Sequence, residues 1–264
     1  MMDLASALIL GLIEGITEFL PVSSTGHMIL ASALMNLDGS GLATFEISIQ
    51  LGAILAVVVL YWPRFRGLLD PSARQKFSGL YGLWLLFLTC LPAGMLGLAA
   101  HSYIKEFLFK PLPVAAALAC GAVLMLLVER KRPPVRYSGL DEITPKLALG
   151  IGFCQCLSLW PGFSRSASTI MGGMLLGTDR KTAADYSFIA AVPIMFAATL
   201  FELYKNWFAL DQSEWLFLGV GLAVAFISSM VAVKVFISLL GRLGLAPFAW
   251  YRLALASLVF WFFA

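Results

Sequence analysis

Residues Glu14 to His27 read EGITEFLPVSSTGH, and this stretch decides the fold because it places charged and hydroxyl groups inside a hydrophobic segment. It contains two carboxylates, a Ser-Ser-Thr run and an imidazole, with Pro21 between the acids and the hydroxyls. A charged group at membrane depth costs about 2.5 kcal/mol or more on insertion scales. We therefore expect this cluster to be a functional site and not part of an ordinary lipid-facing helix.

The chain as a whole is strongly apolar. It has 264 residues, of which 60% are hydrophobic and 12% are charged, with a mean hydropathy of +0.89. A helix that spans a membrane needs roughly 20 apolar residues. Apolar runs of this length lie at 44–62, 80–98, 112–129, 186–203, 215–233 and 247–264. They lack the period-two alternation of a barrel. The sequence predicts an all-α polytopic membrane protein with six transmembrane helices.

A second interrupted segment resembles the first. Residues 19–26, FLPVSSTG, align with residues 159–166, LWPGFSRS, with their prolines matched, and residues 11–14 align with 152–155. Pro and Gly interruptions at corresponding places in two halves point to re-entrant helix pairs that meet at a binding site. We predict one membrane domain, residues 1–264, built of two repeats at about 1–132 and 143–264. Two re-entrant pairs leave three full spans in each half, so the repeats should have inverted topology.

The basic residues predict the orientation. The loops at 63–79, 130–146, 178–185 and 234–246 carry 13 Lys and Arg, whereas the N-terminus and the loops at 99–111 and 204–214 carry 3. Cytoplasmic loops are the ones enriched in Lys and Arg. Both termini and the first re-entrant pair are therefore expected on the outer side. The net charge of +3 is small and is spread over these loops, which argues against nucleic acid as a partner.

Two arginines lie outside all of these loops. We expect Arg165, in the second interrupted segment, to approach the Glu14 to His27 cluster if the tips of the two re-entrant pairs meet at mid-depth. Arg252 lies in the last apolar run, and there we expect its side chain to extend along the helix towards water.

The acids and hydroxyls define a specific chemistry. Glu14 and Glu18 are four residues apart and share one helix face, where two ionised carboxylates repel unless a divalent cation such as Mg²⁺, a shared proton or Arg165 lies between them. Ser24 and His27 are three apart, so an imidazole could move the proton of the hydroxyl. The structural alternatives are a serine that caps a half-helix, a histidine hydrogen-bonded in the bundle, and acids that face a hydrated vestibule.

The presence of Arg165 indicates that the ligand of this site is a phosphate. Helix N-termini after the two breaks would bind anions through free N–H groups, and a guanidinium among small polar residues can hold phosphate oxygens bidentately. From the residues alone, we expect phosphoryl chemistry at or near the membrane surface.

At these residues the chain also resembles the undecaprenyl-diphosphatase family, the bacterial bacitracin-resistance membrane phosphatases. Residues 14–27 match the family pattern E-G-x-T-E-F-L-P-V-S-S-T-G-H, and residues 161–166 match P-G-F-S-R-S-G up to its last position, where Ala167 replaces glycine. The resemblance covers nearly the whole chain. It implies six spans with two re-entrant pairs and hydrolysis of undecaprenyl diphosphate to the monophosphate plus phosphate, which recycles the lipid carrier of peptidoglycan synthesis.

The resemblance also implies roles for particular residues. Glu14 and Glu18 would be the acidic motif and would hold a divalent cation, Mg²⁺ or Ca²⁺. Ser24 and His27 would be the nucleophile and acid/base candidates, and Arg165 the phosphate clamp. The expected supporting donors to the substrate are Ser23, Thr25, Gly26, Ser164 and Ser166. The implied location is the bacterial cytoplasmic membrane, with the active site open to the outer face.

The sequence leaves several alternatives open. Inverted halves with broken helices also build secondary transporters, so the same residues could bind a polyprenyl phosphate lipid for transport or flipping without cleaving it. Neither a phosphoserine intermediate nor direct attack by water is favoured. A homodimer is likewise neither predicted nor excluded.

Overall fold

A computed structural model describes residues 2–37, 40–70, 76–206 and 212–264 of the chain. This described part is helical, with no named strand and one isolated bridge between Tyr137 and Thr178. The α-helices are α1 (Leu4–Thr17), α2 (Ser24–Leu34), α3 (Ser40–Leu60), α4 (Trp62–Leu69), α5 (Gly79–Ala99), α6 (His101–Tyr103), α7 (Pro111–Lys131), α8 (Pro145–Gln155), α9 (Arg165–Leu175), α10 (Arg180–Asn206), α11 (Gln212–Leu243) and α12 (Ala246–Phe263). Short π or 3-10 turns cover Ile104–Leu108, Leu140–Glu142 and Cys156–Leu159.

The six predicted spans are confirmed. Six described helices are long and apolar enough to cross a membrane, and they correspond to α3, α5, α7, α10, α11 and α12. Two of them extend beyond the predicted ends, because α10 begins at Arg180 and α11 continues to Leu243. Residues 180–185 and 234–243, which we expected in loops, are therefore helical. The predicted loops at 63–79 and 204–214 lie partly outside the described residues.

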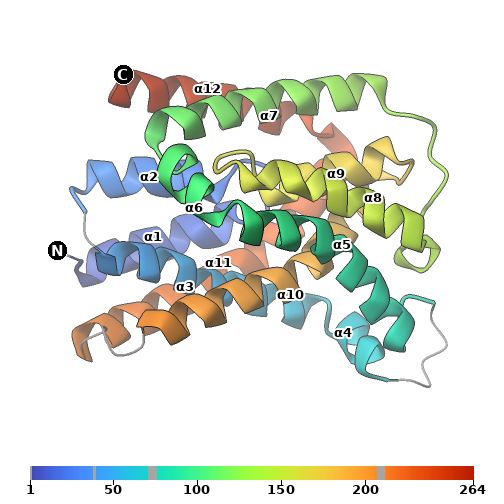
Figure 1. The fold of residues 1–264 in the computed structure, drawn as a ribbon, viewed down its shortest axis with the longest axis horizontal. Coiled ribbons are helices and arrows are strands. Elements are labelled where there is room, and N and C mark those ends of the chain that lie inside the picture. Colours follow the sequence, from blue (N-terminus) through green and yellow to red (C-terminus); the bar gives the residue numbers. More distant parts are fainter. Residues whose placement is uncertain (1, 38–39, 71–75, 207–211) are drawn as a thin grey trace.

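The two interrupted segments form pairs of short helices. The break after α1 separates it from α2, and the break after Gln155 separates α8 from α9. In Figure 1, α1 and α2 occupy the left half of the molecule and α8 and α9 the right half, between longer helices such as α7 and α3. Each short helix of these pairs has 11 to 14 residues, too few to cross a bilayer. The re-entrant and inverted topology remains a prediction.

Small residues let the short helices approach the long ones closely. α1 packs against α11, and α8 packs against α5. A Cβ atom added at Gly15 would overlap Ser228 Oγ and lie 2.5 Å from the carbonyl oxygen of Ala225, and one added at Gly11 would lie 2.7 Å from that of Gly221. Association of membrane helices depends on such close packing, since lipid supplies no hydrophobic drive between them.

Polar contacts join the helix ends beside the basic loops. Glu129, near the end of α7, forms an ion pair with Arg180 and accepts the backbone N–H of Leu245 at 3.0 Å. Tyr61 donates its hydroxyl to Asp185 Oδ1 at 2.6 Å, which joins the end of α3 to the start of α10. These contacts hold the two halves of the chain together at the basic end of the bundle.

We predict that Gly15→Ala destabilises the protein by about 1–3 kcal/mol, since overpacking a tight contact has a cost of this size. Thermal unfolding in detergent should show a lowered midpoint. Gly94→Ala in α5 is the matched control, because nothing lies within 4 Å of its added Cβ. An equal midpoint for Gly15→Ala and wild type would contradict the packing of α1 on α11.

Candidate active site

The two breaks end in the same unusual backbone conformation. Ser23 precedes α2 with φ 68° and ψ 100°, and Ser164 precedes α9 with φ 76° and ψ 119°. A positive φ is uncommon for a residue other than glycine and is costly unless its surroundings hold it. Each serine hydroxyl accepts a helix N–H, from Gly26 at 3.4 Å and from Ala167 at 3.2 Å. Both serines are thus used as N-caps.

These caps correct the alignment of the two segments by one residue. Ser23 and Ser164 are 141 positions apart, as are the aligned residues 11–14 and 152–155, whereas the matched prolines are 140 apart. Ser24 therefore corresponds to Arg165, each being the first residue of its helix. The serine and the arginine occupy equivalent places at the two helix starts.

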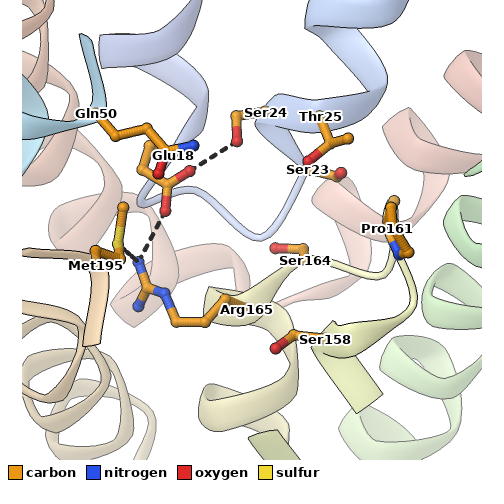
Figure 2. Close-up of a pocket in the computed structure, with 11 residues that line it drawn as sticks. Glu18, Ser23, Ser24, Thr25, Gln50, Ser158, Pro161, Ser164, Arg165 and Met195 are labelled. Carbon is orange, nitrogen blue, oxygen red and sulfur yellow. Dashed lines mark hydrogen bonds and ion pairs between the residues drawn. The ribbon is translucent and has the colours of Figure 1, made fainter. Parts of the chain in front are cut away.

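The two helix starts share one cavity of about 180 Å³, shown in Figure 2. The prediction that the segments around residues 24 and 165 meet is confirmed. The lining residues are Glu18, Ser23, Ser24, Thr25, Gln50, Ser158, Pro161, Gly162, Ser164, Arg165 and Met195. The first N–H groups of α2 and α9 have no partner within their helices, so the cavity lies where an anion would be bound.

Glu18 connects the two halves of the site. Its Oε1 atom accepts Arg165 Nη2 at 3.1 Å, and its Oε2 atom accepts the hydroxyl of Ser24 at 2.7 Å, as Figure 2 shows. The side chains of this ion pair are 13% and 9% exposed, so water screens it little. Breaking such a pair by removing one partner is strongly destabilising, since it leaves a buried charge uncompensated.

Further contacts fix Arg165. Its Nη1 atom donates to the carbonyl oxygen of Ser187 at 3.1 Å, and its guanidinium carbon lies 5.3 Å from the ring centroid of Phe19. Its Nε–H is buried without a partner among the described residues. Arg165 is thus held in place while one donor stays available. Phe19 is fully buried and makes an edge contact with Phe188, so this side of the site is apolar.

The structure does not bring His27 to Ser24. His27 Nδ1 bonds the carbonyl oxygen of Ser23 at 2.7 Å, and Nε2 bonds the hydroxyl of Tyr251 at 2.7 Å. A carbonyl only accepts, so Nδ1 carries a proton, and both ring nitrogens are engaged away from the cavity. Here the partner of the Ser24 hydroxyl is Glu18, in place of the imidazole expected from the three-residue spacing. His27 instead holds the carbonyl of the strained residue before α2.

Glu14 also lies outside the cavity. It is 1% exposed, and its Oε1 atom has no hydrogen-bond partner among the described residues. Its carboxylate lies close enough to Glu18 to interact electrostatically, as the four-residue spacing predicts, and it also interacts with Glu46 and Arg165. One arginine balances only one of the two acids, so a proton or a cation is needed to balance the second.

The donor set for a metal is incomplete. In the described part of the chain, no group of three His, Cys, Asp or Glu side chains is arranged to hold a metal ion. Both oxygens of Glu18 already have partners, and Glu14 offers one free oxygen. A cation at this place would need further ligands from water or from phosphate oxygens, which is how proteins often hold Mg²⁺.

The predicted supporting residues divide into two groups. Ser23, Thr25 and Ser164 line the cavity, whereas Gly26 and Ser166 do not. Ser166 donates its hydroxyl to the carbonyl oxygen of Leu20 at 2.9 Å, so it joins the second turn to the first. Gly26 makes room for Leu118, which would lie 2.8 Å from an added Cβ. These two residues shape the backbone of the site and do not face the cavity.

Arg252 is the largest departure from expectation. Its side chain is fully buried and does not extend to water. It donates to three carbonyl oxygens, those of Pro21 at 3.3 Å, Gly162 at 3.0 Å and Ala117 at 3.3 Å. Pro21 belongs to the first break and Gly162 to the second, so one guanidinium holds both turns. The sequence signal was its position, because Arg252 and Arg165 are the two arginines outside the loops.

A cavity between two helix starts and an arginine, inside a bundle of six apolar spans, indicates a polytopic membrane protein with a site suited to a phosphate group. Comparisons of the sequence with known proteins show which family it belongs to. The model of the family described as bacitracin resistance protein BacA matches residues 7–258. The chain belongs to this family.

Relatives with the printed name undecaprenyl-diphosphatase match along the whole chain. The proteins of Nitratidesulfovibrio vulgaris (strain DP4) and Maridesulfovibrio salexigens are each 61% identical over 264 residues and all of both chains. The protein of Lawsonia intracellularis is 54% identical over 259 residues, 97% of each chain.

We predict that Arg252→Met lowers both the thermal midpoint in detergent and the enzymatic turnover, because three carbonyl groups and two turns lose their common donor. Hydrogen bonds to charged groups contribute about 1.5–3 kcal/mol each. Arg252→Lys should recover only part of the loss, since an ammonium lacks the planar fork of donors. The control is Arg242→Met, at an exposed position in the last turn of α11. Wild-type stability in Arg252→Met would contradict the clamp.

Proposed function

We propose that this protein hydrolyses undecaprenyl diphosphate to undecaprenyl phosphate and inorganic phosphate, and so recycles the lipid carrier of peptidoglycan synthesis and gives bacitracin resistance. The observation that carries the proposal is the shared cavity, in which Ser24, Glu18 and Arg165 are connected at two helix N-termini. Full-length relatives named for this reaction support it.

The reaction begins with the terminal phosphate bound at the two helix starts. Their N–H groups and Arg165 stabilise the negative charge that develops on the phosphoryl oxygens in the transition state. Glu18 accepts the proton of the Ser24 hydroxyl, with which it already forms a 2.7 Å hydrogen bond. The serine oxygen then attacks the terminal phosphorus, the bond to the bridging oxygen breaks, and the lipid phosphate leaves. Water hydrolyses the phosphoserine and releases phosphate.

Two residues of the motif, His27 and Glu14, have roles although they do not line the cavity. His27 holds the Ser23 carbonyl, and Ser23 keeps the backbone conformation that presents Ser24 at the helix start. Glu14 is the second acid beside Glu18. We propose that a divalent cation, Mg²⁺ or Ca²⁺, would be held by Glu14 and Glu18 together with substrate oxygens. When bound, such an ion would neutralise phosphate charge.

The expected location is the cytoplasmic membrane of a bacterium, with both termini and the active site on the outer side. The excess of Lys and Arg in the loops at the other end of the bundle supports this orientation. The polyprenyl tail would lie along the apolar flanks of the spans.

We predict that Ser24→Ala and Glu18→Gln each lower kcat for farnesyl diphosphate hydrolysis by at least about 10²-fold, the low end of general-base effects. Phosphate release by purified protein in detergent measures kcat. With ³²P in the terminal phosphate, wild type should carry trapped label and Ser24→Ala none. Ser257→Ala, whose hydroxyl bonds the Leu253 carbonyl, is the control. Full activity in Ser24→Ala would exclude the serine as the nucleophile.

We also expect chelator to reduce phosphate release and added Mg²⁺ or Ca²⁺ to restore it, because one arginine cannot balance two carboxylates and a diphosphate. Unchanged rates in chelator would contradict the cation. The same assay tests the rival function. Binding of the lipid diphosphate by wild type without any phosphate release would favour a transporter or flippase over the phosphatase.

A further inference from the structure

Gln50 is a polar residue of the cavity to which the reaction above gives no role. It lies in the middle of α3, between Ile49 and Leu51 in one of the apolar spans. Its side chain is one of those that line the cavity, as is that of Glu18 (Figure 2). An amide in a membrane span is costly without a partner, which makes it a candidate for function.

Several other polar side chains around the cavity already have partners within the protein. Both oxygens of Glu18 accept hydrogen bonds, and the hydroxyl of Ser158 donates to the Gln155 carbonyl at 2.7 Å. Ser23 and Ser164 cap their helices. Among the polar side chains that line the cavity in the described structure, Gln50 and Thr25 form no hydrogen bond with the protein. Their free groups are therefore available to a ligand.

The turn of α3 that carries Gln50 is bonded to two other helices. Glu46, one helical turn earlier, accepts the hydroxyl of Ser32 on α2 at 2.8 Å, which joins α3 to the helix that begins with Ser24. Thr199 of α10 donates to the carbonyl oxygen of Ile47 at 3.2 Å. These two bonds tie the turn of α3 that carries Gln50 to α2 and to α10.

Helix packing does not explain this amide. Residues 45–55 match residues 186–196 of the second half in length and apolar pattern, and this match puts Ala191 at the position of Gln50. Ala191 is fully buried in the main hydrophobic core. The same place on the corresponding helix therefore needs no polar group. The amide is therefore present on α3, in the half of the chain that carries Glu18 and Ser24, and absent from the matching position of α10.

We propose that Gln50 is a further substrate-binding residue, which donates from its carboxamide nitrogen to a non-bridging oxygen of the diphosphate. A neutral amide can donate there without adding a negative charge beside Glu18. It also leaves the anion less tightly held than a second guanidinium would, so the phosphate product can leave. This inference rests on the proposed function, because it names a contact with the same diphosphate substrate.

The test separates binding from turnover. In the Ser24→Ala background, where hydrolysis is blocked, binding of inorganic pyrophosphate is measured by titration calorimetry with Gln50→Met and Gln50→Glu. Loss of a hydrogen bond to a charged group should weaken binding on the order of 10- to 100-fold. Gln50→Glu should weaken it at least as much, because a carboxylate repels the anion. With Ser24 intact, KM for farnesyl diphosphate should rise by a similar factor in Gln50→Met, with little change in kcat.

Ser48→Ala is the matched control, since Ser48 lies on the same helix, is 1% exposed and does not line the cavity. Wild-type affinity in both Gln50 variants would overturn the proposal, and so would a rise in KM for farnesyl diphosphate without weaker pyrophosphate binding. If one variant fails to fold, the other decides. Absence of phosphate release from wild type would instead refute the phosphatase, while pyrophosphate binding would still test Gln50.

Discussion

The structure depends on one constraint, that charge placed among apolar helices must find partners within the protein. The pair of Arg165 and Glu18 satisfies this constraint for the active site, and Arg252 satisfies it through backbone carbonyls. Each arginine joins the first interrupted segment to the second. The buried charges of the site are thus also the groups that hold its two halves together where the breaks meet.

The breaks themselves supply the anion site. A continuous helix has no free N–H groups at mid-depth, whereas a chain that stops and restarts there exposes the first N–H groups of a new helix. Ser23 and Ser164 make the restart possible by capping each helix from a strained conformation. His27 and Ser166 then hold the neighbouring carbonyls of the first break. The motif residues that do not face the cavity are therefore needed for its shape.

The hydrogen-bond partners in the structure favour a different mechanism from the one that the motif alone indicates. A serine and a histidine three residues apart suggest a catalytic pair. In the structure, however, the imidazole of His27 bonds the Ser23 carbonyl and the Tyr251 hydroxyl, and the hydroxyl of Ser24 donates to Glu18. Tyr251, next to Arg252 on α12, completes the framework by bonding His27. Tyr251 and Arg252, adjacent on α12, thus stabilise both breaks through hydrogen bonds.

The sequence alone determined the long helices, the two breaks and the charged residues of the site. Apolar runs of spanning length fixed the six long helices, since lipid excludes any unpaired backbone, and proline with small polar residues marked both breaks. The charges of Glu18 and Arg165 predicted them as site residues, because a charged side chain among apolar helices is costly without a function. Only the tertiary structure decided which side of each short helix faces the cavity. Spacing along the chain could not show that Ser24 turns to Glu18, that His27 turns to Tyr251, or that Arg252 turns inward. Those choices depend on partners more than 200 residues away for His27 and Arg252, and local periodicity holds no information about such distant contacts.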